Sequence, residues 1–207
     1  GIIRRMLDFL TLHPDAFGLD ISDLSLKIVK LKKIKEGFRV ASFGSFTIPE
    51  GVLSQGEIFK EQELADIIKQ SIASVQGEKL NTTFVVASLP EEKAFLQVIQ
   101  LPPMKEEEVV SAVTFESENY IPYPLETVYL DTQIVKPLAN HLDHLDVLVA
   151  SLPRKIVDSY VSLLEVAGLI PRALEIESLA ATRALVRDQT AHFPLLVVDC
   201  GATRTSF

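Results

Sequence analysis

Two segments of the chain share one local pattern, and this pattern constrains the fold more strongly than any other feature. Residues 17–31 and 195–207 each contain an apolar strand, an aspartate, a turn of small polar residues and a second strand. A tight turn of small residues exposes backbone N–H groups that can hold an anion. One such turn is usually only an Asx turn that bonds to its own backbone. Two of them, separated by further strands and helices, predict a phosphate site assembled from distant parts of the chain.

The side chains of the two turns are candidate ligands for phosphate and metal. Asp20 and Asp199 stand at strand ends, where a carboxylate can hold a hydrated Mg²⁺. Lys27 can supply a point charge for phosphate. Hydroxyl donors are offered by Ser22, Ser25, Thr203 and Thr205. Asp23 adds a negative charge beside the phosphate, which is unfavourable unless a cation intervenes.

The chain around the first turn predicts a sheet with a covering helix. Apolar runs predict strands at 17–21, 26–32, 38–48 and 82–90. The first three are short and closely spaced, which is typical of an antiparallel meander, and Gly37 suits a turn that needs a positive φ angle. Between Leu64 and Val75 the apolar residues recur with the period of a helix.

The pattern changes after Pro90 and returns after Pro153. Between these prolines we expect a strand, a helix and two more strands, which together can form a small α+β unit. After Pro153 a helix, a strand and a second helix follow, with Ser178 as the predicted N-cap of the second helix. The predicted fold class is therefore α/β with a mixed sheet. We assign residues 16–88 and 151–190 to a first domain, 89–150 to an inserted α+β subdomain, and 191–207 to the truncated start of a second domain.

Composition excludes several kinds of function. The net charge is -8, and no basic patch interleaved with aromatic residues is present, so nucleic acid is not an expected partner. The single cysteine, Cys200, fits a reducing cytoplasm, and the four histidines lack partners at metal-binding spacing. No apolar run reaches the roughly 18–20 residues that span a bilayer. Residues 1–15 predict an amphipathic helix that packs on protein or lies on a membrane surface.

The same segments resemble a known family. "GLDISDLSLKIVKL" resembles the first phosphate motif of the superfamily of actin, sugar kinases and Hsp70, and most closely its form in the PilM family of type IV pilus assembly proteins. "VVDCGATRTSF" is similar to the second phosphate motif. "LPPMKEEEVVSAVTFESENYIPYPLE" resembles the small subdomain that PilM and FtsA proteins insert into the first actin-like domain. The resemblance covers roughly residues 16–207 and implies an actin-like, ribonuclease H-like domain with this insertion.

The resemblance also implies the cofactor, which is ATP with Mg²⁺. On the first phosphate loop it places Asp20, Ser22, Ser25 and Lys27. On the second it places Asp199, Gly201, Ala202, Thr203, Arg204 and Thr205. Asp20 and Asp199 would hold Mg²⁺ through water. Ser22 stands where the family has a glycine, which weakens phosphate binding if the backbone there needs a positive φ angle or a close approach.

A role and partners follow from the same resemblance. It implies a scaffold at the cytoplasmic face of the inner membrane, peripheral to the bilayer, that binds the tail of a PilN-like membrane protein and works with other pilus assembly proteins. ATP would act as a conformational ligand, with slow hydrolysis or none. Two alternatives stay open: an FtsA-like cell-division filament protein, and a sugar or small-molecule kinase of the same superfamily. The kinase would need a further aspartate as its base.

The partner is expected to dock between the inserted subdomain and the main domain. The strand "AFLQVIQLP" has apolar residues on both faces, with Phe95 and Ile99 on one face and Leu96 and Val98 on the other. One face can pack under the following helix, through Val109, Val113 and Phe115. The other face then either packs internally or accepts an extended peptide.

Overall fold

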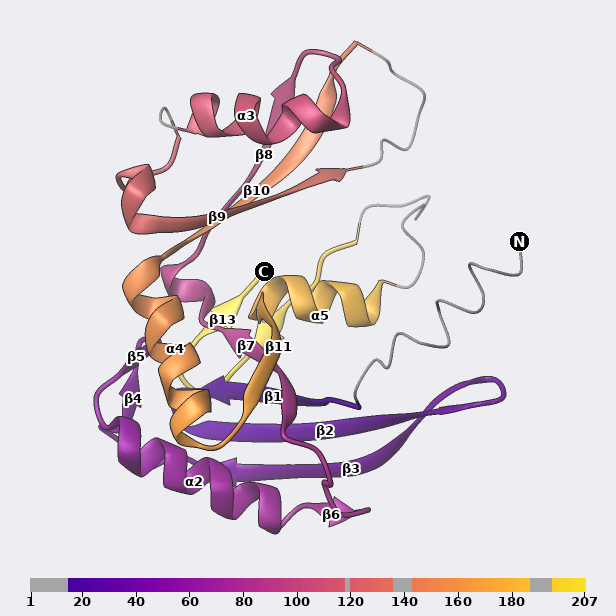
Figure 1. Cartoon of the computed structure of the whole chain (residues 1–207), viewed down its shortest axis with the longest axis vertical. Coiled ribbons are helices and arrows are strands. Elements are labelled where there is room, and N and C mark those ends of the chain that lie inside the picture. The colour runs from indigo at the N-terminus through magenta and orange to yellow at the C-terminus, as the bar shows by residue number, and fades with distance from the viewer. Residues whose placement is uncertain (1–14, 118–119, 136–142, 187–194) are drawn as a thin grey trace.

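A mixed six-stranded sheet in the order β11-β7-β1-β2-β3-β6 forms the base of the molecule (Figure 1). The computed structural model describes residues 15–117, 120–135, 143–186 and 195–207, so the predicted N-terminal helix lies outside the described residues. Strands β1 (Phe17–Ser22), β2 (Ser25–Ile34) and β3 (Gly37–Thr47) form the antiparallel meander. Gly37 has a φ angle of 96°, as the turn requires. The predicted α/β class with a mixed sheet is confirmed.

Parallel pairing places three strand ends at one edge of this sheet. Strand β7 (Phe84–Leu89) runs parallel to β1, and β11 (Ile170–Ile176) runs parallel to β7. The carboxyl ends of β1, β7 and β11 therefore lie at the same edge, where ligands bind in open α/β sheets. At the far side of the sheet, the short strand β6 (Gln76–Gly77) pairs with β3. Strands β4 (Leu53–Ser54) and β5 (Glu57–Ile58) form a separate small hairpin.

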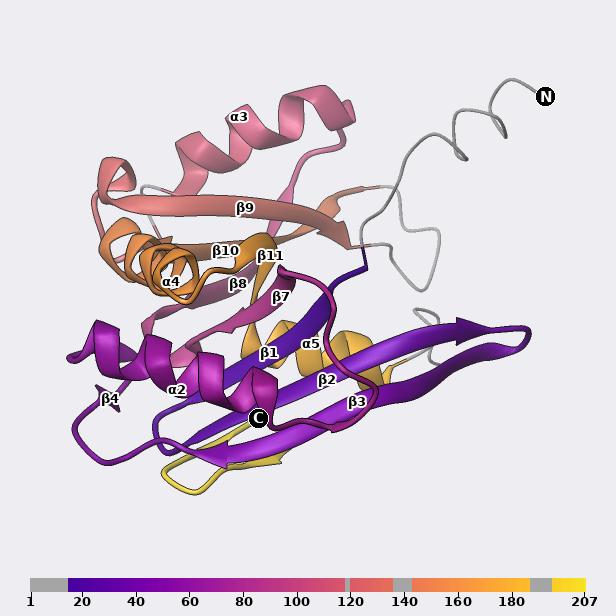
Figure 2. The ribbon, with the colours of Figure 1, turned by 60° about the horizontal axis from the view of Figure 1, so that its bottom comes forward.

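Helices cover both faces of the main sheet. Helices α2 (Glu61–Ala73) and α4 (Arg154–Val166) pack on one face, and α5 (Glu177–Leu185) lies on the other (Figure 2). Successive side chains of β7 point to these two faces in turn. Val85 and Ala87 are buried in the main core, whereas Val86 and Ser88 line a cavity beside α5. The core under α2 and α4 contains large side chains that are almost fully buried, among them Phe17, Ile21, Leu26, Ile28, Leu64, Ile68, Tyr160, Leu163 and Leu164.

The start of α5 differs from the prediction. Ser178 was expected to cap this helix, but α5 begins one residue earlier, at Glu177, with Ile176 in the N-cap position and no side-chain cap. The Ser178 hydroxyl is buried without a hydrogen-bond partner among the described residues. Strand β11 continues to Ile176 because it pairs with β7 up to Leu89, so tertiary pairing sets the helix boundary.

Residues after Pro90 form a second, three-stranded sheet. Strands β8 (Phe95–Leu101), β9 (Val128–Val135) and β10 (Leu145–Pro153) are antiparallel in the order β8-β10-β9. Helix α3 (Glu106–Ser117) covers one face, and the short 3₁₀ helix η1 (Glu91–Lys93) leads from β7 into β8 (Figure 1). A second short 3₁₀ helix, η2 (Leu125–Thr127), precedes β9. We call this three-stranded sheet with α3 the insert; its exact domain limits stay a prediction.

The insert has a small core of its own. It is made of Ile99, Leu101, Val109, Val113, Ile121, Val147 and Val149. The prediction that α3 also buries Phe115 is wrong, because this side chain is 75% exposed. Val109 and Val113 are four residues apart and share one helix face, whereas Phe115 is rotated away from it.

The last described element is the hairpin of β12 (Asp199–Cys200) and β13 (Thr205–Ser206). It contains the second of the two predicted turns. No helix in the described part of the chain combines the length and the apolar character that crossing a bilayer requires.

Candidate functional site

Asp20 is held in a defined orientation at the end of β1. Lys27 lies directly opposite on β2, and its Nζ is 3.2 Å from Asp20 Oδ2. The Ser88 hydroxyl donates to Asp20 Oδ1 at 2.8 Å and accepts from the backbone N–H of Ile21 at 3.1 Å. The parallel pairing of β1 with β7 ends at Leu19, so Ser88 continues the link between these strands through its side chain. Ser88 was not predicted, because its partners are 67 and 68 residues away.

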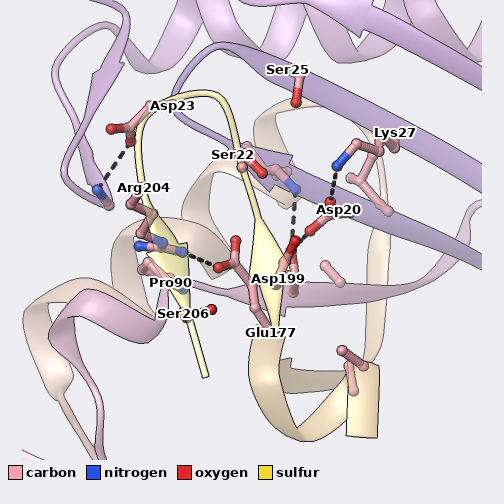
Figure 3. A pocket seen from close by; sticks show the side chains of 18 of the residues that line it. Asp20, Ser22, Asp23, Ser25, Lys27, Pro90, Glu177, Asp199, Arg204 and Ser206 are labelled. Atoms are coloured by element: carbon pink, nitrogen blue, oxygen red, sulfur yellow. Dashed lines mark hydrogen bonds and ion pairs between the residues drawn. The ribbon is translucent and has the colours of Figure 1, made fainter. Parts of the chain in front are cut away.

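The two predicted turns meet across one cavity of about 760 Å³ (Figure 3). Of the residues predicted to bind the nucleotide, the ones that line this cavity are Asp20, Ser22, Ser25, Lys27, Asp199, Gly201, Ala202, Thr203 and Arg204. Thr205 is the exception; the next residue, Ser206, lines the cavity instead. The structure therefore brings together two hairpins that are about 170 residues apart in sequence, which local pattern alone could not establish.

An acidic side chain that was not predicted stands between the hairpins. Glu177, the first residue of α5, lines the same cavity. The pKa of Glu177 is raised to about 7, chiefly by burial and also by the charges of Asp20, Glu91 and Asp199, against a lowering by Lys27. Glu177 could have been predicted from its position at the end of an apolar strand, which is the feature that identified Asp20.

Arg204 is engaged by carboxylates. Its guanidinium forms an ion pair with Glu177 (Figure 3) and a second ion pair with Glu92 of η1. Such contacts favour the charged form of a carboxyl group, so the pair with Glu177 acts against the upward shift of the Glu177 pKa. Arg204 was predicted as a phosphate ligand, and the structure places it at the cavity between the two hairpins with two protein carboxylates as its partners.

Asp23 has a different role from the one predicted. Its carboxylate accepts the backbone N–H of Gln55 at 3.0 Å and that of Gly56 at 3.3 Å, in the turn between β4 and β5. Gln55 has a φ angle of 50° and Gly56 one of 72°, so this turn uses left-handed backbone that the two hydrogen bonds help to hold. Asp23 therefore joins the first phosphate turn to the β4–β5 hairpin, and its charge is balanced by two N–H donors.

Tyr160 extends from α4 to the floor of the cavity. The residue is fully buried, and its hydroxyl has no hydrogen-bond partner among the described residues. Burial raises the pKa of the Tyr160 hydroxyl, and the charges of Glu177, Asp23 and Asp20 add to this shift. A buried hydroxyl without a protein partner that lines a cavity is a donor available to a ligand or a water.

The carboxylates of the cavity fit Mg²⁺ better than a metal with a full protein cage. No three His, Cys, Asp or Glu side chains in the described ranges lie close enough together to hold a metal ion by themselves. Mg²⁺ keeps several waters and takes one or two carboxylates together with phosphate oxygens. Asp20 and Asp199 on the two facing hairpins match that requirement.

A second cavity, of about 390 Å³, lies between the insert and the main sheet. Its apolar lining comes from Leu148 and Leu152 on β10, Val157 on α4, Leu174 on β11 and Leu179 on α5. At its edge Arg183 forms an ion pair with Glu175 at 2.7 Å. We call this cavity the insert groove.

The four residues predicted for partner docking lie beside the insert groove and do not line it. Ile99 is buried under α3, and Phe95 packs on the same core. On the opposite face, Leu96 packs against the main core and Val98 is 52% exposed. Val98 pairs with Leu148, which lines the groove, so this face of β8 continues the groove surface. No pattern in the sequence indicated that β9 and β10 would supply the lining.

A mixed sheet with one strand–aspartate–turn hairpin, faced across a cavity by a second such hairpin, is the arrangement of the actin-like class of proteins. The chain belongs to the PilM family: the family model described as type IV pilus assembly protein PilM matches residues 18–207. The predicted family is thereby confirmed.

Two solved structures are similar to the chain. The chain is 29% identical to a protein of the "PilM-PilN type IV pilus biogenesis complex", with a TM-score of 0.73 over 83% of this chain and 50% of that one. The cytoplasmic domain of EpsL, an inner membrane component of the type II secretion system of Vibrio cholerae, matches with 13% identity and a TM-score of 0.51, over 79% of this chain and 58% of that one. The EpsL likeness supports the fold alone. The chain thus spans about half the length of these solved proteins.

Proposed function

We propose that the chain forms the first part of an actin-like, nucleotide-binding scaffold of a type IV pilus or related secretion machine. The observation that carries this proposal is the meeting of the two hairpins across one cavity. Family membership supports the role in pilus assembly. Because the chain covers half of the solved PilM relative, the nucleotide and partner functions belong to a longer protein and are proposed for it.

The proposed nucleotide is ATP with Mg²⁺. Lys27 would face a phosphate oxygen, and the backbone N–H groups of the two turns would donate to the others. Asp20 and Asp199 would hold the ion through its waters, and the bound ion would neutralise phosphate charge beside them. Ser88 keeps the Asp20 carboxylate turned toward the cavity through its 2.8 Å hydrogen bond. Closure of two domains around this ligand would give the scaffold two conformations.

Calorimetry of Mg-ATP binding tests the site, on a chain extended to the length of the solved relative. Asp20→Ala, Lys27→Ala and Asp199→Ala should each weaken binding by about 1–3 kcal/mol, because each removes a charge-assisted contact. Asp66→Ala is the control, since this exposed aspartate lies on α2, outside the cavity. Equal affinities in all four variants would refute the phosphate site. Ser22→Gly should tighten binding if the serine restricts the approach of the backbone.

The proposed partner is the cytoplasmic tail of a PilN-like membrane protein, bound in the insert groove. The solved relative comes from a complex of PilM with PilN, which supports this class of partner. The groove offers apolar side chains from Leu148 and Leu174 with an ion pair at its edge, as an extended peptide with apolar anchors requires. Binding such a tail would hold the scaffold at the cytoplasmic face of the inner membrane, together with other assembly proteins.

Charge substitutions test the groove. Leu148→Asp and Val98→Asp lie on the groove face of the insert, so they should abolish binding of a PilN-like tail peptide. Val110→Asp is the matched control, because Val110 is 59% exposed on α3, at the opposite side of the insert. Ile99→Asp should unfold the insert, since Ile99 is in its core. If the peptide binds all folded variants as tightly as the wild type, the docking site lies elsewhere.

A further inference from the structure

Arg204 stands between two carboxylates that belong to different parts of the fold. Nη2 contacts Glu177 at the start of α5, and Nη1 contacts Glu92 in η1. The Arg204 side chain is 31% exposed, Glu92 is 26% exposed and Glu177 is 15% exposed. These ion pairs are therefore partly withdrawn from solvent, where they resist screening better than surface pairs do.

Glu92 belongs to the turn that leads directly into the insert. The 3₁₀ helix η1 ends at Lys93, and β8 begins at Phe95. The turn is fixed to the main domain on its other side, where Lys93 pairs with Glu57 at 2.9 Å. In addition, Pro90 packs so closely on Gly56 that a Cβ atom at that glycine would lie 2.5 Å from the proline. Arg204 thus ties the second phosphate hairpin to the start of the insert.

Few cationic side chains line the cavity between the two hairpins. Among the described residues that line it, Lys27 and Arg204 are the only Lys or Arg side chains, and Lys27 faces Asp20. A terminal phosphate entering this cavity therefore competes with protein carboxylates for Arg204. A guanidinium has five N–H donors, and the two carboxylates use different nitrogens, so one contact can be exchanged while the other is kept. Glu92 is the more exposed of the two carboxylates. Leaving its charge unpaired therefore costs less free energy than leaving the charge of Glu177 unpaired.

We propose that Arg204 distinguishes a nucleoside triphosphate from a diphosphate by exchanging Glu92 for the terminal phosphate, and that this exchange releases the η1 turn, which leads into the insert, from the second hairpin. The inference rests on the proposed nucleotide site and adds the residue that reads the terminal phosphate. It also links the bound nucleotide to the insert groove, because η1 and β8 connect the cavity between the two hairpins to the insert. A terminal phosphate attracts a guanidinium more strongly than a single carboxylate because it carries more negative charge and a third acceptor oxygen.

Binding constants for a non-hydrolysable Mg-ATP analogue and for Mg-ADP test the exchange, on the extended chain. Glu92→Gln removes the competitor, so it should tighten analogue binding about fivefold, the equivalent of one partly exposed ion pair, and leave ADP binding unchanged. Glu91→Gln is the matched control, because Glu91 lies in the same turn and is not one of the two carboxylates that form ion pairs with Arg204. Equal tightening by both variants would mean general charge repulsion and would overturn the exchange.

Arg204→Met tests the residue itself, since methionine keeps an unbranched side chain without the charge. This variant should bind the analogue no better than ADP, and adding Glu92→Gln to it should have no further effect. In wild type, the analogue should speed hydrogen exchange of the backbone amides from Lys93 to Leu101, and in Arg204→Met it should not. An acceleration that survives Arg204→Met would overturn the link to the insert. A wild type that binds neither nucleotide would overturn the proposed function as well, whereas equal binding of both nucleotides would overturn this inference alone.

Discussion

Replacing Ser88 by alanine tests how the candidate site is held together. In the structure the Ser88 hydroxyl accepts the N–H of Ile21 and donates to Asp20, so it bridges β7 and β1 at the point where their backbone pairing has ended. Ile21 is 2% exposed, so its backbone N–H loses its acceptor at a largely buried position beside the cavity. The substitution removes one oxygen atom and leaves every apolar contact in place.

The expected cost follows from these two hydrogen bonds. A buried N–H left without a partner costs about 1–3 kcal/mol. The bond to Asp20 contributes about 1 kcal/mol or less, because the Asp20 side chain is 38% exposed and water can solvate it. We therefore expect Ser88→Ala to lower the free energy of unfolding by about 2–3 kcal/mol. Because Asp20 also loses its fixed orientation, Mg-ATP binding should weaken about tenfold.

Ser42→Ala provides a matched control. Ser42 is also fully buried, and its hydroxyl donates to the backbone carbonyl of Glu78 at 2.6 Å, on the β3 side of the sheet. Glu78 is exposed, so its carbonyl can turn to water and the cost should be about 1 kcal/mol. Urea unfolding measures both costs, and calorimetry measures nucleotide affinity. If Ser88→Ala costs no more than Ser42→Ala, or leaves Mg-ATP binding unchanged, Ser88 does not position Asp20.

Three further substitutions separate structural roles from binding roles. Asp23→Ala should lower stability by about 1–2 kcal/mol in thermal unfolding, because two backbone N–H groups of the β4–β5 turn lose their acceptor. Mg-ATP affinity should stay unchanged. A clear loss of affinity would show that Asp23 takes part in phosphate binding. Tyr160→Phe should raise stability by about 1 kcal/mol, since it removes a buried hydroxyl without a described partner; a loss would show that the hydroxyl bonds to a ligand or water. The pKa of Glu177 is raised from 4.5 to about 7, so wild-type stability relative to Glu177→Gln is highest below pH 4.5 and should fall as the pH rises to about 7, by about 1–2 kcal/mol after solvent screening. A flat difference between pH 4 and 8 would contradict this.

The elements set by local chemistry could be predicted from the sequence. Gly37 and Gly168 adopt positive φ angles of 96° and 78° at the ends of a strand and a helix, where glycine has little steric cost. The apolar stripe that includes Leu64 and Ile68 faces the core as its period indicated. The two aspartate turns were recognisable because the whole pattern of strand, aspartate, turn and strand lies within about fifteen residues in each case.

Features that depend on distant partners could not be predicted. Ser88 and Glu177 join the site only because β7 and β11 run parallel to β1 and end at the same edge. The role of Asp23 depends on a turn 32 residues further along the chain. The burial of Phe115 was predicted wrongly for another reason. Phe115 is apolar, and the sequence pattern does not indicate when a single apolar residue on a helix is exposed.

The way in which the insert is attached has an evolutionary consequence. The first residue of β8, Phe95, pairs with Ser151 near the end of β10, so the chain enters and leaves the insert on neighbouring strands. All six strands of the main sheet lie before Pro90 or after Pro153, and their order does not involve the insert. A gene could therefore acquire, lose or exchange the coding segment for this unit without changing the strand order of the ancestral sheet. Lineages with this fold are therefore free to vary this unit while they preserve the main sheet and the cavity at its edge.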